Sequence, residues 1–254
     1  MNDMTMYMIT HKPVEFVPDD RTPIFVGKGN NLHKYISDNT GDNISEKNSN
    51  YCELTALYWM WKNDKSSNYI SIEHYRRFFI RKWSLFPIVC SKKTMLNILN
   101  RYDVVTSSLS LFGISNCEYY RQRHYESDMN EVKKAIMKFC PDYIESFESV
   151  MADDKLPMFN MFALNKELFD AYCEWLFGIL FYVESRIDLN GRTDYQKRVF
   201  GFLSERLMEV WIRKNKLKVY RTPVYRYDEN TIKAVLRSVK DRIPKRFTPT
   251  TPRR

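Results

Sequence analysis

Two adjacent arginines belong to a run of four polar side chains, His74, Tyr75, Arg76 and Arg77, that follows an apolar segment and precedes two phenylalanines. Guanidinium groups match phosphate oxygens with forked pairs of donors, and an imidazole and a phenol add further hydrogen bonds. Losing one charge-assisted hydrogen bond of this kind weakens binding by roughly 1.5 to 3 kcal/mol. These residues could therefore hold a diphosphate, while a structural salt-bridge cluster at a strand end is the alternative that spacing alone leaves open.

A second polar corner, formed by Thr10, His11 and Lys12, follows the apolar segment 4–10. Both corners come directly after an expected strand, and open α/β sheets bind their ligands at the carboxyl ends of strands. If the two strands are neighbours, one crevice receives both sets of groups. We therefore expect Thr10, His11 and Lys12 to act together with His74–Arg77.

Carboxylates that could accept a proton from a hydroxyl group lie in the segment 194–206. Asp194 stands where the N-cap of a helix belongs and could serve only as that cap. Arg198 and Glu205 are seven residues apart, so they share a helix face and could form a buried network. Gln196 adds an amide to this segment, which is richer in acids, bases and amides than a solvated helix face requires.

His124 and Asn160 each have two interpretations. A lone histidine at the expected start of a helix is more often a cap or a solvated side chain than a ligand contact. Asn160 is placed inside the expected apolar strand 157–164, and a buried amide needs partners for its donors and its acceptor. It either fixes a neighbouring segment of backbone or meets a hydroxyl group of a ligand.

Strand-like and helix-like patterns alternate along the chain, which is typical of an α/β domain with a mostly parallel sheet. Asn50 and Glu53 resemble a capping box at the start of a helix, and Pro141 divides a long helical pattern into two. The polar stretch 37–50 predicts an exposed loop. The expected strands are 4–10, 22–29, 69–73, 102–108, 157–164 and 217–225, and the expected helices are 51–62, two within 127–151, 165–187 and 194–215.

Composition indicates one folded domain of 254 residues that works with an anionic partner. Forty Lys and Arg against 31 Asp and Glu give a net charge of +9, which suits nucleic acid, a membrane surface or a phosphate-bearing substrate. We expect the domain to span 1–225 and a basic C-terminal helix and tail to span 226–254. Such tails are usually solvated charge, and docking to anionic lipid is the functional alternative.

Several common classes of protein lack support in this sequence. The five scattered cysteines form no C-x-x-C pair, and neither a Walker A motif, a G-x-G-x-x-G turn, a G-x-S-x-G elbow nor an H-E-x-x-H pair occurs. The first residues lack the basic start and long apolar core of a signal peptide, and the longest apolar run, 175–183, is too short to span a bilayer. We therefore expect a cytoplasmic protein, peripheral at the inner face of the cell membrane at most.

Six stretches resemble, in order and spacing, a bacterial capsular and exopolysaccharide glycosyltransferase family long catalogued as a domain of unknown function. They are "THKP", "TPIFVG", "DNTGDNISEKNSNYCELTALYWMWKN", "YISIEHYRRFF", "NMFALNKELFDAYCEWLFGIL" and "DYQKRVFGFLSERL". The resemblance implies a single Rossmann-like, A-type glycosyltransferase domain, with some members similar to galactofuranosyltransferases of surface polysaccharide assembly. It implies a nucleotide-sugar donor, expected to be UDP-linked, and a polyprenyl-diphosphate-linked or oligosaccharide acceptor.

The resemblance also implies roles for particular residues. The family's His-Tyr-Arg-Arg motif falls on His74–Arg77, where many related transferases place a metal-binding Asp-x-Asp pair. That departure argues against a divalent metal and favours the arginines as the cations that stabilise the departing diphosphate. Within the matched motifs we expect acceptor or sugar contacts from Glu53, Asn160, Gln196 and Arg198. We expect a further contact of this kind from His124, which lies outside the matched motifs. The resemblance does not assign the catalytic base, for which Asp194 is the first choice and Glu205 the competitor.

Two other classes of function remain open from the sequence. A nucleic-acid-binding protein would use the basic excess and the 15% aromatic content, but it needs exposed aromatics interleaved with Lys and Arg. Here the aromatics fall mostly at helical core spacing, so we expect no nucleic-acid partner. A non-catalytic carbohydrate-binding subunit would keep the sugar contacts without turnover.

Overall fold

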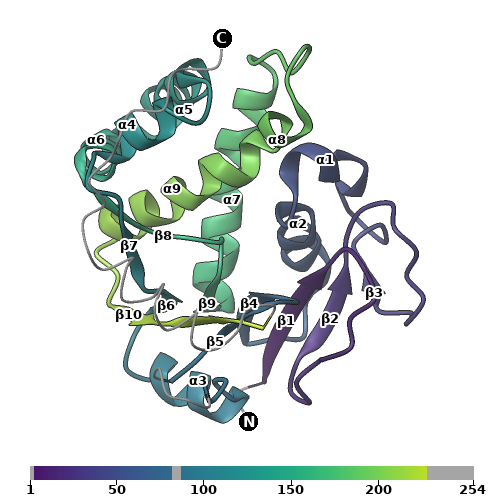
Figure 1. Ribbon diagram of the computed structural model, residues 1–254. Helices are drawn as coiled ribbons and strands as arrows, with labels where there is room; N and C mark the ends of the chain where they lie inside the picture. The colour runs from purple at the N-terminus through teal and green to yellow at the C-terminus, as the bar shows by residue number, and fades with distance from the viewer. Residues whose placement is uncertain (1–2, 82–86, 228–254) are drawn as a thin grey trace.

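The computed structural model describes residues 3–81 and 87–227, which form a central mixed sheet with helices packed on both of its faces (Figure 1). The strands are β1 Met4–Thr10, β2 Thr22–Phe25, β3 Ile36–Ser37, β4 Tyr69–His74, β5 Arg77–Phe79, β6 Val104–Ser107, β7 Leu109–Leu111, β8 Lys155–Pro157, β9 Phe162–Asn165, β10 Val219–Thr222 and β11 Val224–Arg226. The helices are α1 Asn48–Tyr51, α2 Leu54–Asn63, α3 Lys92–Leu99, α4 Asn116–Arg121, α5 Glu126–Phe139, α6 Ile144–Ala152, α7 Lys166–Glu184, α8 Asp194–Lys197 and α9 Val199–Lys214, with short 3-10 turns at Ser45–Lys47 and Pro141–Tyr143.

The sheet has the order β10-β6-β9-β4-β1-β2-β3, and β5 and β11 extend it beside β4. Parallel pairs join β1 to β4, β1 to β2, β2 to β3 and β6 to β10, so the expected mostly parallel α/β sheet is confirmed. Strand β9 is the exception within that order, because it runs antiparallel to both of its neighbours, β4 and β6. Its beginning therefore lies at the same edge as the carboxyl ends of β1, β4 and β6.

Alternation of side chains along the strands divides the core into two parts. Tyr7 and Ile9 of β1 point toward α2, α7 and α9, whereas Met4 and Met6 point toward α3 on the opposite face. The larger part is rich in aromatic side chains from α7 and α9, and Figure 1 shows these helices stacked above the sheet with α3 below it. Burial on both faces explains why β1 reads as a nearly continuous apolar run.

The loop predicted over 37–50 is less exposed than its composition suggests. Ile44 and Asp38 are buried, and Ser45 donates a hydrogen bond to the Asp38 carboxylate over 2.7 Å. The segment also forms a 3-10 turn and the short helix α1. The prediction of an exposed loop over 37–50 was wrong, because the buried side chains of Ile44 and Asp38 attach this segment to the core.

The predicted capping box is also wrong. Helix α2 begins at Leu54 with Glu53 as its N-cap, and Glu53 makes no capping hydrogen bond. The reason lies one residue earlier, since Cys52 adopts φ +53° and breaks α1 from α2. Asn50 instead donates to the Lys197 carbonyl, 3.0 Å away, which ties α1 to α8.

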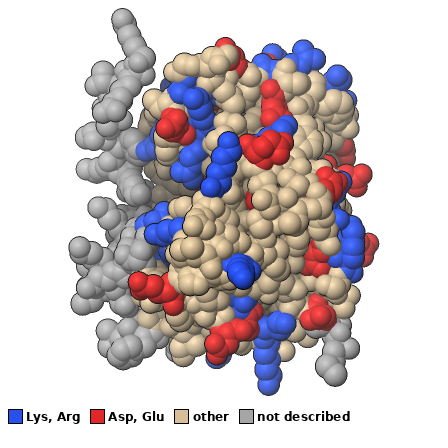
Figure 2. Space-filling view, turned by 90° about the vertical axis from the view of Figure 1, so that its right-hand side faces the viewer, with Lys and Arg blue, Asp and Glu red and all other residues tan. Residues whose placement is uncertain are grey.

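The part of the chain expected to form a basic helix and tail, 226–254, lies outside the described residues except for Arg226 and Tyr227. None of the helices within the described ranges combines the length and apolar character that crossing a membrane requires. On the face that β3 borders, Figure 2 shows basic and acidic side chains interspersed.

Candidate active site

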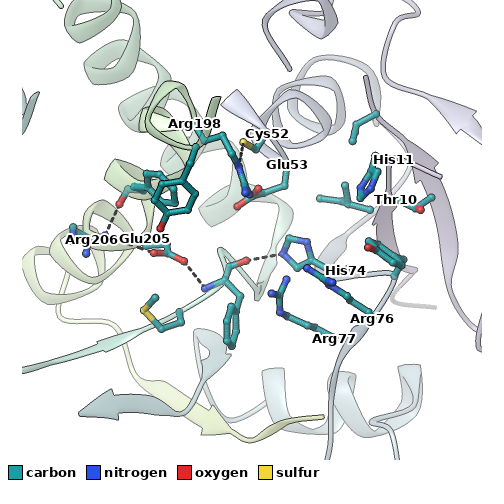
Figure 3. Close-up of a pocket in the computed structure, with 18 of the residues that line it drawn as sticks. Thr10, His11, Cys52, Glu53, His74, Arg76, Arg77, Arg198, Glu205 and Arg206 are labelled. Atoms are coloured by element: carbon teal, nitrogen blue, oxygen red, sulfur yellow. Dashed lines mark hydrogen bonds and ion pairs between the residues drawn. The ribbon is translucent and has the colours of Figure 1, made fainter. Parts of the chain in front are cut away.

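A cavity of about 460 Å³ opens at the carboxyl ends of β1 and β4, between the sheet and helices α4, α8 and α9 (Figure 3). This is the edge at which α/β sheets bind ligands, and the volume is in the range of small-molecule sites. The residues that line it are Ile9, Thr10, His11, Val26, Cys52, Glu53, His74, Tyr75, Arg76, Arg77, Tyr119, Arg123, His124, Met158, Phe159, Tyr195, Arg198, Gly201, Phe202, Glu205 and Arg206.

The two polar corners expected from the sequence meet on the sheet side of this cavity. Ile9 and His74 are paired in the register of β1 and β4, and the Tyr75 amide donates to the Ile9 carbonyl over 3.0 Å. The ring of His11 meets that of Tyr75 edge to face at 5.4 Å. Lys12 is not among the lining residues, and its ammonium lies 5.3 Å from the centre of the Tyr75 ring.

Arg76 lies in the tight turn between β4 and β5, Arg77 is the first residue of β5, and both face the cavity (Figure 3). The Arg77 guanidinium lies 4.6 Å from the centre of the Phe159 ring, and that of Arg76 lies 5.6 Å from the Tyr75 ring, so each arginine stacks on an aromatic face. His74 donates from Nε2 to the Phe159 carbonyl, 2.7 Å away. Burial lowers the pKa of His74, which keeps the ring neutral at pH 7.

The segment 158–161 connects β8 to β9 and forms the floor between the two sides of the cavity. Phe159 and Asn160 adopt φ values of +83° and +50°, so the expected strand 157–164 is interrupted here and β9 begins only at Phe162. The Phe159 amide donates to Glu205 over 2.9 Å. A left-handed pair of non-glycine residues is costly, and it persists where surrounding contacts fix it.

Asn160 supplies those contacts from beneath the cavity. Its Nδ2 donates to Glu53 Oε1 over 2.6 Å and to the Gly201 carbonyl over 3.0 Å, and its Oδ1 accepts from the Ser204 hydroxyl over 2.9 Å. Asn160 is buried and does not line the cavity. Of the two interpretations from sequence, the structure shows Asn160 fixing its neighbours, and in doing so it connects the β8–β9 turn to α9 and to Glu53.

Glu205 on α9 is the more suitable of the two expected carboxylates. It lines the cavity, and burial raises its pKa to about 7, an effect that the nearby Arg206 opposes. Asp194 is exposed and does not line the cavity. It is also not an N-cap, because Thr193 caps α8 by accepting a hydrogen bond from the Gln196 amide. The helix expected over 194–215 is interrupted at Arg198, between α8 and α9.

The helical side of the cavity carries a group of aromatic rings. His124 stacks on Phe202 with ring centres 4.1 Å apart, and Tyr195 lies 5.0 Å from Phe202. His124 follows α4 rather than starting a helix, and burial, followed by the charge of Arg206, lowers its pKa to about 4. Gln196 does not line the cavity, and its Nε2 donates to the Arg123 carbonyl over 2.6 Å.

Arg198 reaches the cavity from the break between α8 and α9. Its Nε donates to Cys52 Sγ over 3.2 Å, and its guanidinium lies beside the Glu53 carboxylate (Figure 3). Burial raises the pKa of Cys52 to about 11, so this thiol is an acceptor and not a nucleophile at pH 7. The sequence predicted a buried network between Arg198 and Glu205. In the structure Arg198 donates a hydrogen bond to Cys52, and Glu205 accepts one from the Phe159 amide.

Sequence reasoning did not assign Tyr119, Arg123, Phe159 or Phe202 to the site. The spacing of Tyr119 and Arg123 was the available signal, because residues four apart share a helix face, and Arg123 does lie over the Tyr119 ring at 3.9 Å. As to a metal, residues 3–81 and 87–227 hold no cluster of three or more His, Cys, Asp or Glu side chains that could bind one.

Comparison with known protein families shows which family the chain belongs to. The family model described as "Domain of unknown function (DUF4422)" matches residues 5–216. The chain belongs to the DUF4422 family. The resemblance drawn from the sequence motifs is therefore confirmed, since the match covers the cavity and every element around it. No curated protein matches the chain.

A solved structure extends the comparison from sequence to fold. The apo structure of WbbM, described as a bifunctional glycosyltransferase, superposes with a TM-score of 0.81 at 28% sequence identity, over 90% of the DUF4422 chain. The chain spans 46% of WbbM, about half of its length. Its single α/β domain therefore has the fold of part of a glycosyltransferase.

Proposed function

We propose that this DUF4422 protein is a glycosyltransferase that moves a hexosyl unit from a UDP-sugar to a lipid-linked or oligosaccharide acceptor during synthesis of a surface polysaccharide. Some members of the family that the sequence resembles are similar to galactofuranosyltransferases, so a galactofuranosyl unit is one candidate for the hexosyl group. The observation that carries the proposal is the position of Arg76 and Arg77, stacked at the carboxyl edge of the sheet in a domain that superposes on WbbM.

Glycosyl transfer needs opposite charges at the two ends of its site. The transition state develops positive charge on the sugar and negative charge on the departing diphosphate. In this proposal Arg76 and Arg77 bind the diphosphate oxygens and stabilise the leaving group without a divalent metal. His74, neutral and tied to the Phe159 carbonyl, holds the turn that presents both arginines.

Glu205 is the general base of this proposal. A base works best when its pKa lies near the working pH, and burial places that of Glu205 at about 7. The Phe159 amide holds Glu205 Oε1 in a fixed orientation, and Oε2, which lies 3.6 Å from Arg206 Nη1, is the oxygen that takes the proton of the acceptor hydroxyl in this proposal. Glu53 is the competing carboxylate of the cavity, but Asn160 already bonds to its Oε1. Asp194 has no part in the proposal because it lies outside the cavity.

Isothermal calorimetry with UDP tests the diphosphate site. We expect binding that survives EDTA and that falls about ten- to a hundredfold in Arg76→Ala and in Arg77→Ala, the loss of one charge-assisted hydrogen bond to phosphate. Arg101→Ala is the matched control, since Arg101 is exposed and does not line the cavity. Absence of UDP binding with and without magnesium or manganese would refute the proposal.

A further inference from the structure

The cavity has two chemically distinct sides, and the proposed donor site accounts for only one of them. The sheet side carries Arg76 and Arg77, whereas the helical side carries the rings of His124, Phe202 and Tyr195, which pack against one another. Tyr195 is 51% exposed although it packs on Phe202, so one face of this aromatic group is open to solvent at the cavity mouth. An open aromatic face beside a catalytic site binds the apolar face of a flat ligand ring.

Positively charged side chains border this aromatic group. Arg123 Nη1 donates to the Tyr119 carbonyl over 3.2 Å, which holds its guanidinium over the Tyr119 ring. On the other side, the Arg198 guanidinium lies 5.9 Å from the centre of the Phe202 ring. Both arginines line the cavity. Arg123 is bonded to the Tyr119 carbonyl and Arg198 to Cys52, and these contacts restrict both side chains before a ligand arrives.

A third arginine lies behind the rings. Arg206 is 1% exposed and lies over the Tyr120 ring at 4.9 Å, and its Nη1 donates to the Phe202 carbonyl over 2.6 Å. Among the described residues its Nε has no hydrogen-bond partner. The carboxylate beside it is Glu205, 3.6 Å away. A buried guanidinium placed behind an aromatic wall attracts negative charge to the space in front of that wall, and the neighbouring Glu205 carboxylate, when ionised, offsets part of this attraction.

The rings and the arginines together suit one kind of ligand. We propose that the helical side of the cavity binds an acceptor in which an anionic group, phosphate or carboxylate, is attached to or next to the sugar ring that receives the transferred unit. The sugar ring stacks on Tyr195 and Phe202, and Arg123 and Arg198 bind the anion. This inference rests on the proposed function, because the acceptor hydroxyl must face Glu205 and a donor on the sheet side.

The anionic group has two sources with the same chemistry. It is the diphosphate of a lipid carrier when the acceptor is the first sugar on that carrier, or the carboxylate of an acidic sugar when the acceptor is a longer glycan. Arginine binds both through paired hydrogen bonds. The geometry of the ring and the anion is therefore shared, and probes that carry one group or the other separate the two sources.

Ligand-observed NMR titrations with saturating UDP test the inference, since UDP occupies the sheet side and reports on the proposed function in the same sample. The probes are methyl galactoside, methyl galacturonide and galactose 1-phosphate. We expect one or both anionic probes to bind about tenfold more tightly than the neutral galactoside, which is the advantage of one hydrogen bond to a charged group. Preference for galactose 1-phosphate points to the lipid-linked acceptor, and preference for the galacturonide points to an acidic glycan.

Two pairs of variants connect the binding to the named residues. Arg123→Gln should remove most of the preference for the anionic probe, whereas Arg121→Gln should keep it, because Arg121 is exposed, pairs with Glu118 and does not line the cavity. Tyr195→Ala should weaken all probes roughly two- to tenfold. Tyr125→Ala should not, since Tyr125 is 46% exposed and also lies outside this cavity.

Each outcome decides between the two proposals. If UDP binds but the neutral and anionic probes bind equally, the inference is overturned and the proposed function stands. Equal losses in Arg123→Gln and Arg121→Gln would also overturn it, because the effect would then reflect overall charge. If UDP itself fails to bind, the proposed function falls and the acceptor inference falls with it.

Discussion

Asn160 offers the sharpest test of how the cavity is held together. Asn160→Ala removes the hydrogen bond to the Glu53 carboxylate, worth about 1.5 to 3 kcal/mol. It also removes the bonds with the Gly201 carbonyl and the Ser204 hydroxyl, worth about 0.5 to 1.5 kcal/mol each. Alanine at φ +50° adds about 1 to 2 kcal/mol of backbone strain. Glu53 borders the cavity and keeps part of its solvent, so we expect a total near the low end, about 3 to 4 kcal/mol.

Urea denaturation measures this loss, and Asn215→Ala is the matched control. Asn215 also donates two hydrogen bonds from Nδ2, to the Trp211 carbonyl and to the Tyr143 hydroxyl, but it is exposed and has an ordinary φ of −84°. We expect Asn215→Ala to lose less than about 1.5 kcal/mol of unfolding free energy. A loss in Asn160→Ala no larger than in the control would refute the role assigned to the Asn160 side chain.

The pH dependence of a third variant separates electrostatics from packing. Asn160→Asp places a second carboxylate 2.6 Å from Glu53 Oε1, and two carboxylates at that distance share a proton. The pKa of the pair is raised in the folded state, so the destabilisation grows as pH rises above the unfolded pKa of about 4 and shrinks in acid. Asn160→Ala should show no such dependence. Parallel behaviour of the two variants between pH 4 and pH 8 would contradict this account.

Three further predictions concern other parts of the chain. Glu205→Gln should lower the rate of glycosyl transfer about 10²- to 10⁴-fold, while its affinity for UDP stays within twofold of the wild type. The wild-type rate should rise with pH up to about 7, which is the raised pKa of Glu205, and then level off. Since that pKa is raised on folding, ionised Glu205 costs stability as pH rises, so Glu205→Gln should be the more stable protein in urea above pH 7. Arg21→Ala should cost about 3 to 5 kcal/mol in thermal or urea unfolding, because it leaves the buried carboxylate of Glu73 without its cation; a loss below 1 kcal/mol would mean that Glu73 takes up a proton instead. A chain ending after residue 236 should keep its far-ultraviolet spectrum and lose binding to anionic liposomes, and unchanged binding would exclude the tail as a membrane anchor.

Apolar strand patterns, and the polar residues at the ends of those strands, were sufficient to predict the part of the site that lies on the sheet. The apolar run of β4 and the polar run after it belong to one continuous segment, so His74–Arg77 had to lie at a strand end. The same holds for Thr10 at the end of β1. Because the two strands are parallel neighbours, both corners reached one cavity as expected, except for Lys12, which does not line it.

The helical side could not be predicted because its contacts join segments distant in sequence. Asn160 was placed inside a strand, since the apolar residues around it fit that pattern and nothing in the sequence reports a positive φ at Phe159 and Asn160. Asp194 was predicted to be the N-cap of the last long helix, but Thr193, one residue earlier, is the N-cap of α8. The stacking of His124 on Phe202 depends on how α4 and α9 pack, which local patterns do not encode.

The placement of β9 has a consequence for the chain while it is being synthesised. Strand β6 is complete at Ser107, but its two sheet neighbours begin only at Phe162 and Val219. At an elongation rate of about 5 to 20 residues per second, the roughly 55 residues that precede β9 take on the order of 3 to 11 s. During that interval both edges of β6 and one edge of β4 carry unpaired backbone groups, which can pair with strands of other chains. The nascent protein is therefore most prone to aggregate before Phe162 leaves the ribosome, and a chaperone that covers strand edges should act within this interval.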